Sequence, residues 1–443
     1  MSYAAAIDGL LSLAGELHAA QGQPRRKFDL NEMRVLTQAL GHPERKFPAV
    51  LVGGTNGKGS TSATLASILT SAGYRTGLYT SPHLSRVNER VRIDRDEISD
   101  DDFAALYFRV DDCARRLVSD GTLRGQPSFF ETMTALAFLA FAEKSVDIAV
   151  LEVGMGGRLD ATNIVDPLIS IITDISLDHT EWLGSTIAAI AHEKAGILRE
   201  NGVLITLPQH PEANQAVGEV ATQLNVRGVS AVPYVPGRDE SEEKNGYSVT
   251  VLGERIEVRS TLTGTHQQRN TALAIAAAVE LRNNNGYNIL PDQIADGILR
   301  TRWPGRMERL SVSGRADVLL DVAHNPAGAW ALRSALSHID PEARHMTAVF
   351  GCLADKPVGE IAQILFPLFE FVVLTEVDSP RRAPLPAMVA AAEFTGVRIQ
   401  TAEDARNALE QAWAITPQDG LVVVTGSVFL VGAIRSMLTE TGL

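Results

Sequence analysis

The sequence predicts two α/β domains, each built on a mostly parallel sheet. The chain has 443 residues, which is longer than one ordinary domain. Short apolar runs alternate along it with stretches of helical period, as in parallel sheets that carry helices on both faces. The segment 301–306 contains a proline and a glycine and interrupts that alternation, so we expect a domain boundary there.

In the first series, between 48 and 207, the apolar runs are short and rich in Val, Ile and Leu. Such runs are typical of buried strands, and the longer amphipathic stretches between them are typical of helices. We expect strands at 49–52, 76–79, 148–153, 168–173 and 203–207, and helices at 59–72, 101–119, 130–143 and 186–199.

The stretch 227–262 differs, because it is polar and carries glycine, with alternating runs at 247–251 and 256–262. It fits either a short antiparallel insertion or a flexible flap. Helical period returns at 267–281. We therefore place a first domain at 1–300 with a small β insertion near 227–263, a linker at 301–307 and a second domain at 308–443.

The second domain repeats the alternation on a smaller scale, which predicts a Rossmann-like α/β domain at the C-terminal end. We expect strands at 318–322, 346–350, 371–375 and 421–425, and helices at 326–337, 357–366, 383–393, 402–414 and 428–438.

Composition excludes several classes of function. An apolar content of 45% with 21% charged residues indicates a soluble globular protein. A net charge of −13 argues against nucleic acid as a partner, since no basic excess exists to neutralise phosphates. No run reaches the roughly 20 apolar residues that a membrane span needs. Asp8 and Glu16 interrupt the apolar N-terminus, which favours an amphipathic helix over a signal peptide. Cys113 and Cys352 show no metal or redox spacing, which fits a cytoplasmic protein.

A glycine-rich segment, Gly53 to Ser60, joins the first predicted strand to the first predicted helix. Glycines let the backbone approach a ligand closely, and amides at a helix start point at an anion. Lys58 adds a positive charge for terminal phosphates, and a hydroxyl can hold Mg²⁺. This order predicts a P-loop mononucleotide-binding domain, although only three residues separate Gly53 from Gly57, and Gly59 lies between Lys58 and Ser60. A glycine turn without a ligand is the alternative.

Polar side chains follow the other predicted strands, at the carboxyl ends where parallel sheets bind ligands. Glu152 closes one strand and could reach Mg²⁺, or else lie in solvent. Asp178 and His179 follow another, and the histidine could ligate metal, orient a phosphate or serve only the structure. Ser81 follows the second strand.

Three further groups belong to the same pattern. Lys194 lies in a helical stretch, where it is either a solvated charge or a group near the phosphates. In the second domain Asp321 and His324 end a strand, and helix capping would explain neither of them. With Arg306 of the linker, these two residues could close over a nucleotide bound to the first domain.

Taken together, the segments resemble the folylpolyglutamate synthase family of the Mur ligase superfamily, and most closely its bifunctional dihydrofolate synthase/folylpolyglutamate synthase members. The resemblance covers nearly the whole chain in the family's order. The matching segments are GTNGKGS (54–60), TSPHLSRVNERVRI (80–93), LEVGMGGRLDATNIV (151–165), LDHTEWLG (177–184), HEKAGI (192–197), HQQRN (266–270), WPGRME (303–308), DVAHNP (321–326) and TGSVFLVG (425–432).

The resemblance implies an ATP-dependent ligase in which ATP phosphorylates a carboxylate and the amine of L-glutamate attacks the acyl phosphate. It implies that the nucleotide contacts are Gly54, Thr55, Asn56, Gly57, Lys58, Gly59, Ser60, Asn270, Arg306 and Asp321. It also implies two Mg²⁺ ions, the first on Ser60 and Glu152 and the second on Glu152, His179 and Ser81. Lys194 matches a lysine that is carbamylated in the superfamily, and His324 matches a phosphate-proximal histidine.

Phe130, Glu131, Asp160 and Ala161 match the pterin-side pocket of members that accept dihydropteroate, with Ser81 beside them. An aromatic ring can stack on the flat pterin, and Asp160 could accept hydrogen bonds from its N–H groups. We therefore expect dihydropteroate, folates and L-glutamate as small-molecule substrates of a monomer. The alternatives are folylpolyglutamate synthase activity alone, a Mur-type ligase for another carboxylate, and a nucleotide-dependent switch without chemistry.

Overall fold

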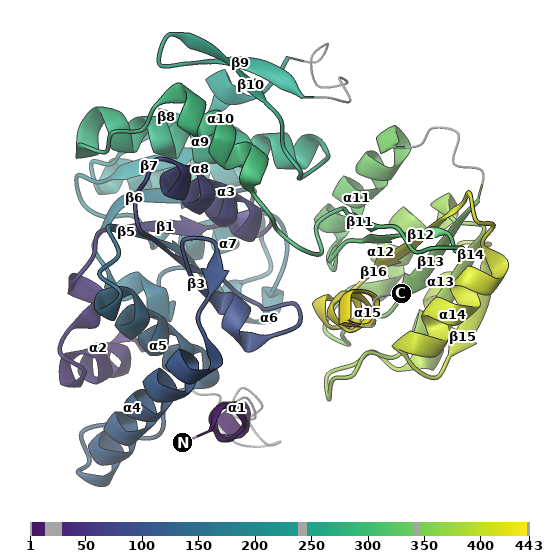
Figure 1. Cartoon of the computed structure of the whole chain (residues 1–443), viewed down its shortest axis with the longest axis horizontal. Coiled ribbons are helices and arrows are strands. Elements are labelled where there is room, and N and C mark those ends of the chain that lie inside the picture. The colour runs from purple at the N-terminus through teal and green to yellow at the C-terminus, as the bar shows by residue number, and fades with distance from the viewer. Residues whose placement is uncertain (1, 14–28, 238–245, 340–344, 441–443) are drawn as a thin grey trace. The chain divides into compact units, whose positions relative to one another are not determined.

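A computed structural model describes residues 2–13, 29–237, 246–339 and 345–440 of the chain. The chain divides into two compact units, each made of segments that are not continuous in sequence (Figure 1). The first unit comprises Met1–Ser81, Asn88–Ser260 and Arg269–Thr301, and the second comprises Pro82–Val87, Thr261–Gln268 and Arg302–Leu443. The segments 82–87 and 261–268, which the sequence places in the first domain, thus group with the second unit.

The first unit contains, within the described residues, an eight-stranded sheet in the order β4-β3-β2-β5-β1-β6-β7-β8. The strands from β2 to β8 in that order run parallel, and β3 and β4 are antiparallel at one edge. Their bounds are β1 (Ala49–Gly53), β2 (Thr76–Tyr79), β3 (Val91–Ile93), β4 (Asp96–Glu97), β5 (Ile148–Glu152), β6 (Pro167–Ile172), β7 (Val203–Thr206) and β8 (Arg227–Ser230).

Helices cover both faces of this sheet. The chain crosses from β1 to β2 through α3 in one direction along the sheet. It crosses from β2 to β5 and from β6 to β7 in the opposite direction. Because such crossovers are right-handed, the helices fall on opposite faces, as Figure 1 shows for α3 and α5. The α-helices are α1 (Tyr3–Ser12), α2 (Leu30–Ala39), α3 (Lys58–Ser71), α4 (Asp100–Ser119), α5 (Phe129–Glu143), α6 (Thr180–Leu183), α7 (Ile187–Ala195), α8 (Pro211–Gln223), α9 (Thr265–Asn285) and α10 (Pro291–Arg300), with α9 beginning in the second unit.

The topology explains where a ligand belongs. Strand β1 has β5 on one side and β6 on the other, and the chain leaves it in one direction and returns in the other. This is the switch point of an open α/β sheet, where ligands bind beyond the carboxyl ends of the strands. The predicted strands of the first series are confirmed within one residue at each end, as are helices α3, α4 and α5.

The insertion was predicted only in part. The hairpin of β9 (Tyr247–Val251) and β10 (Glu254–Val258) confirms its antiparallel half. Residues 227–230, however, form β8, which pairs in parallel with β7 and extends the main sheet. The placement of 227–230 in the insertion is therefore wrong. Its exposed, polar side chains are those of an edge strand, which lacks the apolar signal of a buried one.

The second unit contains, in its described part, a six-stranded sheet in the order β11-β12-β16-β13-β14-β15. Among the described strands of this sheet, β11 pairs antiparallel with β12 and the others pair in parallel. The strands are β11 (Glu308–Leu310), β12 (Asp317–Leu320), β13 (Met346–Phe350), β14 (Phe371–Thr375), β15 (Arg398–Ala402) and β16 (Leu421–Thr425). The helices are α11 (Pro326–Ile339), α12 (Val358–Leu365), α13 (Leu385–Glu393), α14 (Ala405–Ile415) and α15 (Val428–Glu440).

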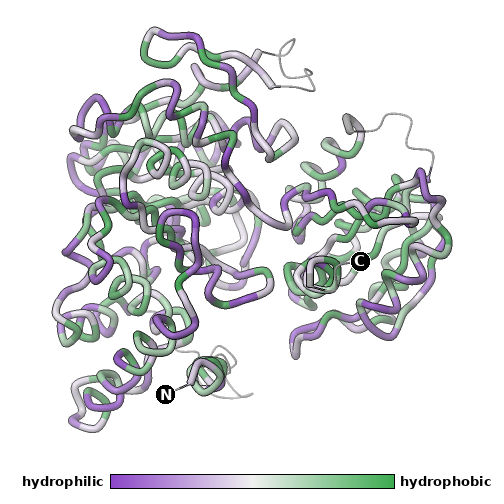
Figure 2. Tube along the Cα trace, viewed as in Figure 1, coloured by the Kyte–Doolittle hydropathy of each residue, from purple (hydrophilic) through white to green (hydrophobic). Residues whose placement is uncertain are grey.

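Buried apolar side chains hold each sheet to its helices. Val50, Leu51 and Val52 of β1 are fully buried, and so are Val422, Val423 and Val424 of β16. Figure 2 shows hydrophobic segments in both units, along strands and along helices. Such burial on both faces is why the strands read as continuous apolar runs in the sequence.

Two smaller predictions can be checked here. The predicted N-terminal helix is present as α1, which buries Ala6 and Leu10, and the remainder of that stretch lies outside the described residues. Cys113 and Cys352 are both free and buried. No helix among the described residues has the length and apolar character that crossing a membrane requires.

Candidate active site

The glycine loop lies at the carboxyl end of β1, where α3 begins. Gly57 caps α3 with a φ of 88°, a left-handed conformation that glycine adopts without strain. A Cβ at Gly57 would lie 2.2 Å from Oδ1 of Asn270, and one at Gly54 would lie 1.8 Å from Oγ1 of Thr173. Glycine is therefore favoured at Gly54 and Gly57 for two reasons. A side chain there would collide with a neighbour, and the backbone torsion is one that glycine adopts without strain.

The loop is tied to the turn that follows β6. The amides of Thr55 and Asn56 both donate to the carbonyl of Asp174, over 2.9 and 3.1 Å. The amide of Thr61 donates to the carbonyl of Gly57 inside the helix. The amides at the first positions of a helix have no partner within it, so those at 58–60 are the ones suited to an anion.

Two ammonium groups flank the loop, and both bond to its carbonyls. Nζ of Lys58 donates to the carbonyl of Thr55 over 3.0 Å, and Nζ of Lys194 donates to the carbonyl of Gly54 over 2.6 Å. Lys194 is buried, and this burial, together with the positive charge of Lys58, lowers its pKa to about 7. The alternative of a solvated lysine at 194 is therefore wrong.

The strand β5, next to β1, ends in an acidic group. Glu152 ends β5 with 4% exposure, and its Oε2 accepts the amide of Ser81, at the end of β2, over 3.1 Å. The alternative of a solvent-exposed Glu152 is therefore wrong. Ser60, on the first turn of α3, is also buried.

Magnesium fits part of the predicted ligand set. The hydroxyls of Ser60 and Ser81 and the carboxylate of Glu152 are oxygen donors of the kind that Mg²⁺ prefers. His179 offers nitrogen instead, and it lies exposed on a turn with a φ of 49°. Across the described ranges, no group of three or more His, Cys, Asp or Glu residues could hold a metal ion. The predicted set relies on two serines and stays a prediction.

The predicted acceptor side lies at the start of α5 and in the segment after β5. The Phe130 ring lies 6.0 Å from the ring of Tyr79, and it leaves no room for a side chain at Gly154. Asp160 is buried, and its carboxylate accepts hydrogen bonds from the amides of Met155 and Thr162 and from the Thr162 hydroxyl. Burial nevertheless raises the pKa of Asp160. The fold itself therefore occupies hydrogen-bond acceptor positions of Asp160 that the sequence analysis assigns to a ligand.

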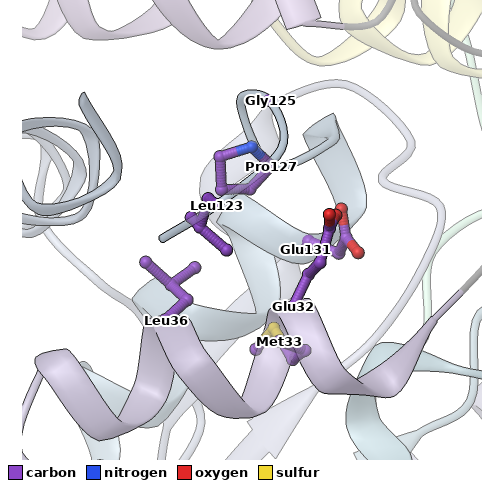
Figure 3. A pocket seen from close by; sticks show the side chains of 7 residues that line it. All are labelled: Glu32, Met33, Leu36, Leu123, Gly125, Pro127 and Glu131. Atoms are coloured by element: carbon purple, nitrogen blue, oxygen red, sulfur yellow. The ribbon is translucent and has the colours of Figure 1, made fainter. Parts of the chain in front are cut away.

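Glu131 likewise has a structural partner. Its Oε2 accepts the amide and the hydroxyl of Ser128, which completes a capping box at the start of α5. Glu131 also borders a shallow surface depression that it shares with residues of α2, and Figure 3 shows its carboxylate on the same side as that of Glu32. Ala161, the remaining predicted residue, is buried in the short turn after Asp160.

In the second unit, Asp321 and His324 lie at the carboxyl end of β12. Asp321 is buried, and its carboxylate accepts the amides of Met307 and Ala323 over 3.1 and 3.0 Å. Nδ1 of His324 lies 2.8 Å from the carbonyl of Val322. Arg306 is half-buried beside Met307.

The first unit thus brings the glycine loop, Lys58, Lys194 and Glu152 together at the carboxyl ends of its central strands. Sequence reasoning gave no role to two residues there, Asp174 and Arg269, whose side chains form a bidentate ion pair beside the loop. No local pattern signals this pair, because 95 positions separate its members. The Glu131 cap did carry a signal, since Ser-x-x-Glu before an apolar run is typical of a capping box.

Comparison with known proteins agrees with this geometry. The family model of the Mur ligase middle domain matches residues 52–278, and that of the Mur ligase glutamate ligase domain matches 305–428. Dihydrofolate synthase/folylpolyglutamate synthase of Bacillus subtilis is 35% identical over 423 residues, which cover 93% of this chain and 95% of that protein. The namesake from Mycobacterium tuberculosis is 34% identical and covers 94% and 92%.

Solved structures give the same result. Folylpolyglutamate synthase of Mycobacterium tuberculosis, complexed with ADP and AMPPCP, superposes with a TM-score of 0.88 at 33% identity, over 99% of both chains. FolC of Escherichia coli, in complex with DHPP and ADP, has a TM-score of 0.85 at 29% identity, over 100% of this chain and 99% of that one.

The fold and the loop define an ATP-dependent ligase that forms amide bonds. Within that class, the chain belongs to the dihydrofolate synthase/folylpolyglutamate synthase family of Mur ligases.

Proposed function

We propose that this ligase joins L-glutamate to dihydropteroate, to folylpolyglutamates, or to both. An oxygen of the acceptor carboxylate attacks the γ-phosphorus of ATP, and ADP leaves. The amine of L-glutamate then attacks the acyl carbon, and inorganic phosphate leaves with the electron pair of the broken C–O bond. The observation that carries the proposal is the glycine loop flanked by Lys58 and Lys194, in a chain with these relatives.

The chemistry demands charge of this kind. A carboxylate and a triphosphate repel each other, so positive groups must be fixed where negative charge accumulates. The hydrogen bond from Nζ of Lys58 to the Thr55 carbonyl holds the ammonium group at the loop. The positive charge is therefore in place before the phosphates bind. Asn270 borders Gly57, and it is assigned with 54–60 to the nucleotide.

Two Mg²⁺ ions would screen the phosphate charge, the first held by Ser60 and Glu152 and the second by Glu152, Ser81 and His179. Glu152 is directed by the amide of Ser81, so it is held in place before any cation binds. Lys194, with its pKa lowered to about 7, is partly a neutral amine near neutral pH. The neutral amine is the form that carbon dioxide can carbamylate.

On the acceptor side, we assign Phe130 to stacking on the pterin and Asp160, Ala161, Glu131 and Ser81 to its surroundings. The Asp160 carboxylate accepts hydrogen bonds from the amides of Met155 and Thr162, from the Thr162 hydroxyl and from the backbone of Gly154. We therefore assign Asp160 to positioning the turn at 160–164 in the surroundings of the pterin.

The second unit contributes Arg306 and Asp321 to nucleotide binding and His324 to the phosphates. Asp321 holds two backbone amides, which fixes the strand end that carries His324. We further propose that the protein works as a cytoplasmic monomer on small molecules alone.

A Mur-type ligase for another carboxylate is the second candidate. Phe130, packed on Gly154 and Tyr79 beside the buried Asp160, favours a flat acceptor over a peptide.

Mass spectrometry of the products tests the proposal. The protein is incubated with ATP, Mg²⁺ and L-glutamate, together with either dihydropteroate or a tetrahydrofolate. A mass increase of one glutamate residue on both acceptors supports two activities, and an increase on tetrahydrofolate alone supports one. No increase on either acceptor would refute the assignment.

A further inference from the structure

Arg269 and Asp174 form an ion pair that the family motifs leave unexplained. Nε and Nη2 of Arg269 donate to the two carboxylate oxygens of Asp174, over 3.1 and 2.6 Å, and Nη2 also donates to the carbonyl of Pro208. The pair joins the turn after β6 to helix α9. A bidentate contact of this kind fixes the orientation of both side chains.

Asp174 touches the glycine loop through its backbone. Its carbonyl accepts the amides of Thr55 and Asn56, so its carboxylate branches from a residue that is bonded directly to the loop. Charges closer than the Debye length, about 8 Å at physiological ionic strength, are not fully screened from each other, so an anion in the adjacent loop can sense the charge of that carboxylate. Without a counter-charge, the carboxylate of Asp174 would repel the phosphates.

Arg269 is bound to the loop from the other side through its neighbour. The Oδ1 of Asn270 lies where a side chain at Gly57 would be, and the carbonyl of Asn270 accepts the Thr61 hydroxyl over 3.4 Å. The start of α9 is thus linked to the loop by two neighbouring residues. Arg269 reaches the loop through Asp174, and Asn270 contacts Gly57 directly.

Stability alone does not account for the pair. The side chains of Arg269 and Asp174 are 31% and 40% exposed, and ion pairs with this exposure contribute at most about 1 kcal/mol. Thr55 and Asn56 bond to the carbonyl of Asp174, which any residue would supply. What the arginine adds at this place is charge.

We propose that Arg269 is a positioning residue for nucleotide binding, which neutralises Asp174 and holds it away from the phosphates in the glycine loop. The inference rests on the proposed nucleotide site. It assigns a role to two side chains outside the predicted set of nucleotide contacts.

The test is ADP affinity, measured by titration calorimetry on the full-length protein. Arg269→Met should weaken ADP binding about three- to tenfold, because an uncompensated charge remains near the phosphates. Asp174→Asn should bind at least as tightly as the wild type, since it keeps the carbonyl and loses the charge. The double variant should return to within about twofold of the wild type, and Arg269→Lys should restore most of the loss.

The matched control is Arg300→Met, which breaks an ion pair with Asp296 whose aspartate side chain is also 40% exposed. Asp296 bonds to Ser71 at the far end of α3, roughly 20 Å along the helix from the loop. This variant should leave ADP affinity unchanged. The deficit of Arg269→Met should also shrink in high salt, as an effect of charge must.

Two outcomes would overturn the inference. Equal losses in Arg269→Met and Asp174→Asn without recovery in the double variant would indicate a structural contact only. Unchanged affinity in Arg269→Met would show that the pair has no role in binding. Failure of the proposed function is distinguishable, because the wild type would then bind ADP no better than Lys58→Ala.

Discussion

Two strand-to-helix junctions of this chain, one in each unit, are built by opposite means. Between β1 and α3 the junction is made of backbone, and added atoms at Gly54 or Gly57 would collide with Thr173 or Asn270. Between β12 and α11 it is made of side chains. There Asp321 accepts two amides, and Oδ1 of Asn325 accepts the amide of Gly328 at the helix start.

The difference indicates how each junction fails. A junction made of glycine backbone leaves helix amides for an anion and tolerates no extra atom. A junction made of buried side chains satisfies its own amides and tolerates no lost acceptor, since an unsatisfied buried amide is costly. Substitutions at the first junction should therefore affect ligand binding before folding, and substitutions at the second should affect folding first.

The largest effect is expected for Lys58→Ala. Removing one preorganised charge from the site should lower the rate of ligation by about 10²–10³-fold, with the fold retained. Steady-state phosphate release and circular dichroism measure the two effects. Wild-type turnover in this variant would refute the phosphate role of Lys58.

Gly57→Ala sharpens the same comparison with a matched control. The new Cβ would lie 2.2 Å from Asn270, so we expect ADP affinity to fall by about tenfold or more, each tenfold being about 1.4 kcal/mol. Gly73, at the other end of α3, has a φ of 90° and open space around it. Gly73→Ala should cost only the left-handed strain of about 1–2 kcal/mol in unfolding free energy and leave ADP affinity intact. Equal affinity in both variants would contradict the account.

Asp321→Ala addresses the second junction. It removes the acceptor of two amides, so denaturant unfolding should show a loss of about 1–3 kcal/mol. Asp317→Ala, on the same strand, breaks only a surface pair with Arg309 and should cost less than about 1 kcal/mol. Similar losses in both variants would count against a structural role for the Asp321 carboxylate.

The most gradual effect is a pH dependence from Lys194, which is small over any single pH unit. Its pKa is about 7 in the folded protein and 10.5 as a model value, so between these pH values the unfolded chain binds the extra proton. The free energy of unfolding should therefore rise with pH in that window, by at most about 1.4 kcal/mol per pH unit. Lys194→Met should lose this rise. Identical pH slopes for the two proteins would show that Lys194 is not held neutral.

The sequence predicts the buried centre of each sheet best, because strands covered on both faces leave continuous apolar runs. The strands at 346–350, 371–375 and 421–425 agree with the structure at both ends. Edge strands are different. The half-exposed strands β11 and β15 and the exposed strand β8 carry mixed residues, and their pairing comes from neighbours that the local pattern does not reveal.

For the site, local motifs were sufficient to place the glycine loop, Lys58 and Glu152. They could not show which polar groups the fold itself uses. The contacts of Glu131 and Asp160 are local, and the Glu131 capping box carried a signal in the sequence. The Asp321 carboxylate, however, accepts the amide of Met307, and the Asp174–Arg269 pair joins distant segments. These last two contacts depend on tertiary packing, which residue spacing does not encode.

Phosphate release is the measurement that tests the central claim most directly. The protein is given ATP and Mg²⁺ with the acceptor alone, with L-glutamate alone, and with both. The account predicts rapid release only when both are present, because the amine must take the activated acyl group. Release at the same rate without L-glutamate would contradict it.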